Sequence, residues 1–389
     1  MRLSGTKTGS VNTYKGLGNQ LYDLGGARPT LDLNFANNES LDDSITGKNL
    51  VSFTRASSAT YVDGDGLIQS ASTNTPRFDH DPATGESLGL LIEEARTNVV
   101  TYSEDFGNVV WNVSNNATVA LSAVDNPSGV SQTWRLTENA GTGVKSFNQA
   151  VSTNPTSATL SIFVKPDGRN WFFLQGSAVG GTSIPVADRR VWFDLVNKTV
   201  GTVGSSFSNA QVQEFSNGWL RLSAFLDVSG TGNTLTNAVY ALANGDGVGS
   251  YTGDGSSGVY IWGAQREDSV SFPTSYIPTE GSTVTRAADV AEITGANFSS
   301  FYNQTEGTVF TEFDLSNVGT DNLYVYEFRS DVNNRILSLA RGDAGNLGYV
   351  STAGVVEVRI DKNTGWVNNQ YYKTAFGVAN NNVAMFLDG

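Results

Sequence analysis

The feature that most constrains the fold of this chain is a succession of short apolar and β-branched runs separated by glycine, asparagine and aspartate turn signals. Between residues 101 and 280 the runs include Thr159–Lys165, Trp171–Gln175, Arg190–Asp194, Trp219–Phe225 and Val259–Gly263. Short strands at regular spacing are typical of β-sandwiches and jelly rolls. No long segment repeats its apolar residues with the period of a helix, so we expect an all-β chain with little helix.

The residue counts exclude several kinds of site. The 389 residues contain no cysteine and one histidine, which excludes disulfide scaffolds, cysteine nucleophiles and metal sites built on cysteine or on two histidines. His80 alone could serve a serine-based triad. The formal charge of −14 has the sign of nucleic-acid phosphate, so nucleic acid is not an expected partner. At ~150 residues per domain, the length predicts two or three domains.

No targeting or membrane segment is predicted. The first ten residues, Met1–Ser10, lack the apolar core of a secretory signal. No apolar run approaches the ~18 residues of a membrane span. Membrane insertion is therefore not expected.

Residues 1–50 are predicted to be an extended or docking segment, with a flexible leader as the alternative. Within them, the alternation of apolar and polar residues in Leu31–Phe35 predicts a half-buried strand. Residues 51–100 predict a connector of two β-hairpins, with turns at Asp63–Gly66 and Asp79–Gly85. Glycine accepts the positive φ that such tight turns require.

In the last third of the chain, the sequence predicts a connecting segment followed by a second set of strands. Residues 281–304 are expected to be the link, with one strand or a helical turn in Thr285–Thr294. Strand runs begin at Gly307–Leu315 and continue to Val383–Leu387. The sequence stops in the hairpin-like Phe386–Gly389, and a strand without its partner leaves an open edge, so we expect the native polypeptide to continue.

Three groups of motifs resemble proteins of tailed bacteriophages. The first group is Phe53–Tyr61, Thr75–Asp81 and Gly89–Asn98. The second is Trp262–Glu267, Phe272–Thr279 and Thr285–Asp289, and the two groups bracket a jelly roll similar to carbohydrate-binding modules on phage tail and head fibres. The third is Thr305–Phe310, Tyr372–Gly377 and Ala384–Gly389, which looks like the first part of a concanavalin A/laminin-G-like sandwich.

This resemblance implies a structural fibre or spike protein located in the virion. Its parts would be a virion-anchoring segment (1–50), the hairpin connector (51–100), the jelly roll (101–280), the linker (281–304) and the partial sandwich (305–389). It is expected to be a non-enzymatic homotrimer, with other virion proteins (tail, baseplate or capsid) and a host-surface glycan as partners. The alternatives are a purely architectural head-decoration or baseplate/tail adaptor protein, and a polysaccharide depolymerase.

A carboxylate pair on one predicted strand is the candidate for catalysis. Glu312 and Asp314 would point to the same face of the strand. Glycosidases of the concanavalin-like fold resemble this with a Glu-x-Asp-x-x-Glu strand, whose outer carboxylates are nucleophile and acid/base. The third position here is Asn317, which removes one of the two carboxylates that retaining hydrolysis needs. We therefore expect solvated surface acids and assign no catalytic residue.

Two other charged motifs are expected to be structural. Glu93 and Glu94 precede Arg96, which is expected to pair with an acid where the chain enters the jelly roll. The single histidine, His80, lies between two aspartates, and a turn is expected there rather than a metal site.

The acidic glycine-rich loop Gly245–Gly255 is the candidate for a cation site. Jelly-roll modules often hold Ca²⁺, so Asp246 and Asp254 are the candidate ligands of a possible structural ion. Plain turns are the alternative because the EF-hand spacing is missing. No other cofactor is expected.

Aromatic and apolar side chains provide the remaining candidates. A tryptophan within an apolar run is expected to lie in the core. Trp171 and Tyr251 border polar loops and, with Asp254, are the candidate glycan-binding residues. The candidate virion-anchoring residues are Leu31, Leu33 and Phe35.

Overall fold

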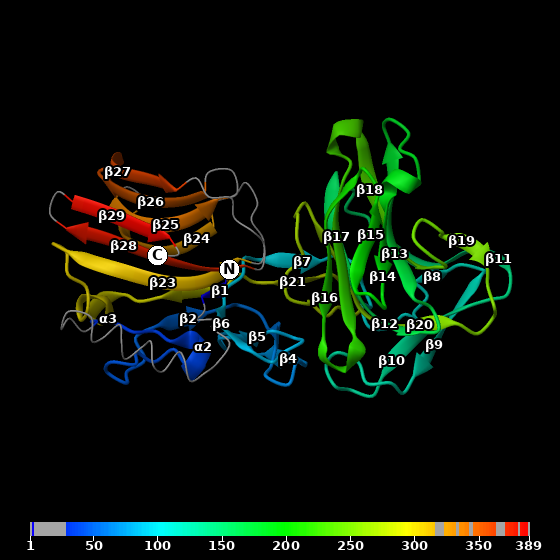
Figure 1. Cartoon of the computed structure of the whole chain (residues 1–389), viewed down its shortest axis with the longest axis horizontal. Coiled ribbons are helices and arrows are strands. Elements are labelled where there is room, and N and C mark those ends of the chain that lie inside the picture. Colours follow the sequence, from blue (N-terminus) through cyan, green and yellow to red (C-terminus); the bar gives the residue numbers. More distant parts are fainter. Residues whose placement is uncertain are drawn as a thin grey trace.

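The structure, a computed structural model, describes residues 2–3, 29–315, 323–331, 334–341, 345–362, 370–379 and 382–387. These residues form antiparallel sheets with little helix, which confirms the predicted all-β class. Figure 1 shows two lobes: the jelly roll made by the middle of the chain, and a second lobe that holds both ends of the chain.

Two sheets build the jelly-roll lobe. The six-stranded sheet has the order β16-β17-β12-β20-β10-β9, and the seven-stranded sheet has the order β15-β14-β13-β18-β11-β19, with β8 also paired to β11. The strands of the first are β9 (Ala117–Ser122), β10 (Thr133–Glu138), β12 (Ser157–Asp167), β16 (Phe207–Glu214), β17 (Leu220–Asp227) and β20 (Gly258–Asp268). The strands of the second are β8 (Asn112–Val113), β11 (Thr142–Ala150), β13 (Trp171–Gly180), β14 (Arg190–Asp194), β15 (Thr199–Val203), β18 (Asn233–Ala243) and β19 (Ser250–Thr252). Three 3-10 turns connect strands: η1 (Ala187–Arg189), η2 (Ser216–Gly218) and η3 (Ser229–Thr231).

The core of this lobe lies between the two sheets. Successive side chains of a strand point to opposite faces, so Phe172 and Leu174 of β13 point inward and pack in one cluster with Leu160 and Ile162 of β12. Trp192, Trp219 and Trp262 are buried, as expected for tryptophans in apolar runs, but they lie in smaller clusters outside this core.

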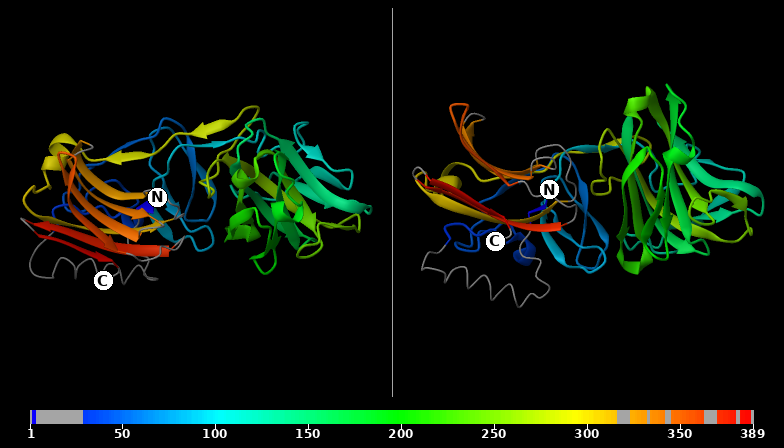
Figure 2. Two further views of the ribbon diagram at one scale, coloured as in Figure 1. Left: turned by 90° about the horizontal axis from the view of Figure 1, so that it is seen from above. Right: turned by 45° about the horizontal axis from the view of Figure 1, so that its top comes forward.

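The second lobe contains a six-stranded sheet and a four-stranded sheet, which face each other in the right-hand view of Figure 2. The first has the order β29-β28-β23-β1-β6-β5. Its strands are β1 (Arg2–Leu3), β5 (Phe78–His80), β6 (Ser87–Leu91), β23 (Gly307–Leu315), β28 (Gln370–Ala379) and β29 (Asn382–Leu387). The second consists of β24 (Leu323–Asp331), β25 (Asn334–Arg341), β26 (Gly345–Thr352) and β27 (Val355–Lys362). A Cβ on Gly348 would lie 2.6 Å from the ring of Phe376 and 3.0 Å from Sδ of Met385, so the two sheets pack tightly there.

Both predicted hairpins are present in the connector. The strands β3 (Ala59–Val62) and β4 (Ile68–Ala71) flank the Asp63–Gly66 turn, and β5 and β6 flank the second turn. At the second turn Asp81 Oδ1 accepts hydrogen bonds from the backbone of Ala83 and Thr84, both at 3.0 Å.

The connection after the jelly roll is more structured than the sequence predicts. It holds two strands, β21 (Val284–Arg286) and β22 (Val290–Glu292), and the short helix α3 (Gly295–Ser299). β21 pairs with β7 (Arg96–Asn98), and β22 pairs with β2 (Ser52–Thr54). Residues before and after the jelly roll therefore form one common body.

The predicted strand at Leu31–Phe35 is wrong. Residues 29–34 are not regular secondary structure, and the helix α2 (Phe35–Asn38) begins there instead. The Asn34 side chain caps this helix by accepting a hydrogen bond from the Asn37 backbone at 3.3 Å. Phe35 is buried against Val51, Phe53 and Leu90, and Leu33 packs on the same cluster.

In the part of the chain that the structure describes, no helix has the length and apolar character needed to cross a membrane.

Candidate functional site

The outer face of the seven-stranded sheet, opposite the core, carries the candidate binding site. Its residues alternate with the core residues: Trp171, Phe173, Gln175 and Ser177 on β13 point to this face. The face divides into an aromatic half and a polar half.

The aromatic half is closed. Phe173 is fully buried and Trp192 is 3% exposed. Arg190 covers the ring of Phe173, with its guanidinium carbon 4.8 Å from the ring centroid. Gly249 is packed beside both, since a Cβ there would lie 3.0 Å from Phe173 and 3.1 Å from Arg190. The loop through Gly249 therefore covers these rings and leaves no open stacking surface on them.

The polar half is open and consists of half-buried side chains, which we call the amide–arginine row: Arg190, Gln175, Asn148 and Asn237. Arg190 of β14 pairs in register with Gln175 of β13. Val239 of β18 pairs with Gln175 on one side and with Asn148 of β11 on the other. Arg190 Nε donates to Gln175 Oε1 at 2.6 Å, and Asn237 Nδ2 donates to Asn148 Oδ1 at 3.2 Å. Asn148 Nδ2 also donates to the carbonyl of Asn112 at 3.1 Å, so these bonds fix the planar groups of the row in place.

Trp171 lies at the edge of this face. It is half-buried beside the aromatic half and pairs in register with Asp194 and Ala243. A Cβ on Gly201 would lie 2.8 Å from its ring, so β15 packs closely against the indole. Its role in glycan binding remains a prediction.

Tyr251 does not border open solvent, which corrects its assignment as a glycan-stacking residue. It is 7% exposed, and its ring has Lys145 Nζ 4.6 Å and Arg169 Cζ 4.9 Å from its centroid. Its hydroxyl donates to Glu138 Oε2 at 2.7 Å. Burial and this hydrogen bond raise the pKa of Tyr251 well above its ordinary value.

The nearby backbone carbonyls already hold a cation, the buried ammonium of Lys145. Lys145 Nζ donates to the carbonyl oxygens of Gly141, Gly143 and Tyr251 at 2.8, 3.1 and 2.9 Å. Burial lowers the pKa of Lys145. The ammonium group of Lys145 therefore supplies the positive charge where the loop Gly245–Gly255 meets β11.

The two candidate calcium ligands are engaged in local hydrogen bonds. Asp254 Oδ1 accepts from the backbone of Ser256 and Ser257, both at 2.7 Å, and the bonds from Ser257 lower its pKa well below the usual range. Asp246 accepts from the backbone and the hydroxyl of Thr202 at 2.8 and 2.9 Å. Among the residues that the structure describes, no three histidine or acidic side chains are gathered as a metal would require. A structural Ca²⁺ remains a prediction without a preformed acidic cluster.

The carboxylate pair on β23 is not solvated, contrary to expectation. The side chain of Glu312 is 8% exposed and pairs with Lys373 of β28 at 2.8 Å. Asp314 is also buried. Asn317 lies outside the described residues.

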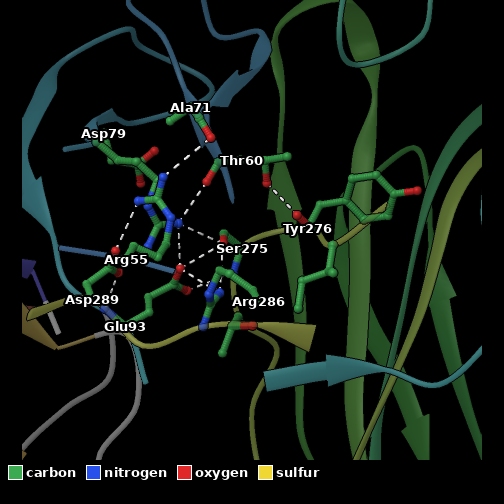
Figure 3. A network of polar contacts seen from close by, with 12 residues as sticks. Arg55, Thr60, Ala71, Asp79, Glu93, Ser275, Tyr276, Arg286 and Asp289 are labelled. Carbon is green, nitrogen blue, oxygen red and sulfur yellow. Dashed lines mark hydrogen bonds and ion pairs between the residues drawn. The ribbon is translucent and has the colours of Figure 1, made fainter. Parts of the chain in front are cut away.

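A second notable site lies between the lobes, where three arginines and two carboxylates are buried together (Figure 3). We call this set, Arg55, Arg77, Arg286, Glu93 and Asp289, the arginine–carboxylate cluster. Glu93 Oε2 accepts from Arg77 at 2.8 Å and from Arg286 at 2.7 Å. Asp289 pairs with Arg55 at 3.1 Å and with Arg77.

Backbone groups complete the cluster. Ser275 donates to Glu93 through its backbone at 2.8 Å and its hydroxyl at 2.7 Å. Arg77 also donates to the carbonyl of Thr60 at 2.8 Å, and the Thr60 hydroxyl donates to the carbonyl of Tyr276 at 2.5 Å. Burial alone would raise the pKa of Glu93, but Arg286 and Arg77 hold it well below its usual range. The cluster thus stays ionised and joins the connector to the segment that leaves the jelly roll.

Sequence reasoning missed the arginine–carboxylate cluster, although the signal was present. The five members lie in four of the quoted motifs: Phe53–Tyr61, Thr75–Asp81, Gly89–Asn98 and Thr285–Asp289, the last of which holds both Arg286 and Asp289. Their hydrogen-bond partner Ser275 lies in a fifth motif, Phe272–Thr279. A charged or hydroxyl residue in every motif could have suggested one shared site. Glu94 pairs with Arg96, as expected for the start of the jelly roll.

The comparisons with known proteins are distant. No family model and no curated protein matches the chain. The enzymatically active domain of tailspike protein 4 of bacteriophage CBA120 is similar at 13% identity and a TM-score of 0.27, over 43% of this chain and 21% of that chain. The glycoside hydrolase domain of Endo-D from Streptococcus pneumoniae R6 is similar at 9% identity and a TM-score of 0.21, over 71% of this chain and 36% of that chain.

Two facts follow from these comparisons. The chain is similar in part to a bacteriophage tailspike domain, and it matches well under half the length of either structure. Both names belong to enzyme domains, which contradicts the expectation of a non-enzymatic chain, so that expectation is withdrawn.

Proposed function

We propose that this chain is a virion-associated fibre or spike protein of a tailed phage, and that its jelly roll recognises a host-surface glycan. The phage-like motifs support the first part. The observation that carries the second is the amide–arginine row, a set of planar polar groups held in fixed positions on an open sheet face.

Such a row suits sugars chemically. Neighbouring hydroxyls of a pyranose each need a donor and an acceptor, and amide side chains provide both. Binding sites use a few well-placed polar groups on a rigid scaffold, and the sheet provides that scaffold. Because Gln175 and Asn148 lie two strands apart, with Val239 of β18 between them, they would contact separate parts of a bound glycan. Single-site affinity is expected to be weak, and a homotrimer would raise avidity.

Leu33 and Phe35 are less suited to anchoring than proposed from sequence, because they pack in the chain's own core. Docking of residues 29–50 to other virion proteins, and the place of the protein on the tail, baseplate or capsid, stay predictions.

Glycan-array binding by the full chain tests the proposal. We expect specific signals that fall at least about tenfold in Gln175→Ala and Asn148→Ala, since each change removes hydrogen bonds to the ligand. The matched control is Gln213→Ala on β16 of the other sheet, which should bind like the unchanged protein. A blank array, or loss in the control alone, would contradict glycan recognition by this face and favour an architectural role.

A further inference from the structure

Two consecutive arginines, Arg189 at the end of η1 and Arg190 at the start of β14, stand out in a chain with 38 acidic and 24 basic residues. Arg189 and Arg190 are half-buried, yet among the described residues neither forms an ion pair with a carboxylate. The adjacent acid, Asp188, pairs with neither of them. By contrast, Arg135 and Arg169 on the same lobe pair with Asp167 and Glu138.

The two guanidiniums are held near one strand segment. Arg189 Nη1 donates to the carbonyl of Gly176 at 2.8 Å, and Arg190 Nε donates to Gln175 at 2.6 Å. The β13–β14 ladder ends at the Gln175–Arg190 pair, so Arg189 reaches across the β13 edge that β14 leaves open. Burial lowers the pKa of Arg190, and the charge of Arg189 lowers it further.

A cavity of about 220 Å³ lies beside this edge. It is lined by Arg189, the β13 residues Ala178–Gly180, Ser183 and Asn233, among others. Arg189 and Ser183 thus share this cavity, while the amide of Asn233 already donates to Thr182 and Thr231. A like-charge pair without a carboxylate is unfavourable in the free protein, and an anion between the two would relieve it.

We propose that Arg189 and Arg190 form an anion site and that the recognised glycan is acidic, bearing a carboxylate on its sugar. This inference rests on the proposed function and names its substrate class. Guanidinium groups present donors in a fork that matches a carboxylate. The sugar ring would lie on Gln175 and Asn148, and its carboxylate would face the arginines.

The test compares acidic polysaccharides with their neutral forms. Polygalacturonate, alginate, hyaluronan and polysialic acid are each measured by calorimetry against the full chain, beside the same polymer after carboxyl reduction. We expect at least one acidic polymer to bind, and its reduced form to bind at least about tenfold more weakly. Equal binding of the two forms would overturn the inference.

Variants separate a site from general charge attraction. Arg189→Gln and Arg190→Gln should each weaken binding of the acidic polymer at least about tenfold. Arg135→Gln removes the same charge from the opposite sheet and should leave this binding unchanged. If all three substitutions weaken binding of the acidic polymer alike, no specific site exists. If a neutral glycan binds and is lost in Gln175→Ala but not in Arg189→Gln, the proposed function stands and the acidic assignment fails. Near-ultraviolet circular dichroism confirms folding of each variant.

Discussion

Glu93 shows how one buried carboxylate can determine acid stability. Its pKa is held well below the ordinary value of 4.5 by Arg286 and Arg77 against the effect of burial. A depressed pKa stabilises the folded state fully above the unfolded value, and this stabilisation is lost as the pH falls below it. Glu93→Gln should therefore cost roughly 3–5 kcal/mol at pH 7, and the gap to the unchanged protein should narrow from about pH 5 to pH 3.

Chemical denaturation at several pH values measures this gap. The control is Glu214→Gln, whose pair with Lys198 has both side chains 45% exposed, so its effect should stay within about 1 kcal/mol. If Glu93→Gln lowers the free energy of unfolding by the same amount at pH 7 and pH 3, the lowered pKa of Glu93 is contradicted.

Single residues also show where sequence reasoning about the site reached its limit. The burial of Trp192, Trp219 and Trp262 could be predicted because their strands are apolar. The burial of Tyr251 could not be predicted, because the residues that cover its ring are distant in sequence: Lys145 lies on β11, and Arg169 lies in the loop between β12 and β13. Local sequence carries no information about which distant strand supplies a neighbour.

The β3–β4 hairpin is an element whose role depends on packing as well as on its turn. Ile68 of β4 packs with Phe163, Trp219, Trp262 and Tyr276 on the outer face of the six-stranded jelly-roll sheet. Ile68→Ala should lower the free energy of unfolding by about 2–5 kcal/mol, since it leaves a cavity among large rings. Urea titration followed by tryptophan fluorescence measures this, because Trp219 and Trp262 line the same cluster.

The matched change is Leu121→Ala on β9, where the side chain is 60% exposed. It should alter stability by less than about 0.5 kcal/mol. Equal losses for the two variants would mean that the hairpin does not pack on the jelly roll in solution.

Elements were predictable where their signals are local. The hairpins around Asp63–Gly66 and Asp79–Gly85 follow from turn chemistry, and the strands from Gly307 to Leu387 follow from their alternation. The pairs β2–β22 and β7–β21 were missed because each joins segments about half the chain apart. At Leu31–Phe35 the alternating pattern was present, but the Asn34 cap favoured a helix start.

At the scale of the whole molecule, the arginine–carboxylate cluster joins the segments that enter and leave the jelly roll. Asp289 pairs with Arg55 and Arg77, and its carboxylate is fully buried. Asp289→Asn should therefore loosen one lobe relative to the other. The lack of cysteine makes this measurable, because cysteines introduced at the exposed Val179 and Val355 can carry spin labels.

We expect a narrow distribution of label distances in the parent protein and a broader one in Asp289→Asn. Asp167→Asn, which breaks the exposed pair with Arg135, serves as the control and should leave the distribution unchanged. An equally narrow distribution in all three would show that the cluster does not set the relative position of the lobes.

The pairing of β1 with β23 also constrains the order of events during synthesis. Leu3 pairs with Leu90 on one side and Phe313 on the other. At ribosomal speeds of about 5–20 residues per second, Arg2–Leu3 emerges roughly 15–60 s before Phe313. Until then the nascent chain has only one neighbour for this strand, so the jelly roll can fold first and this sheet closes last.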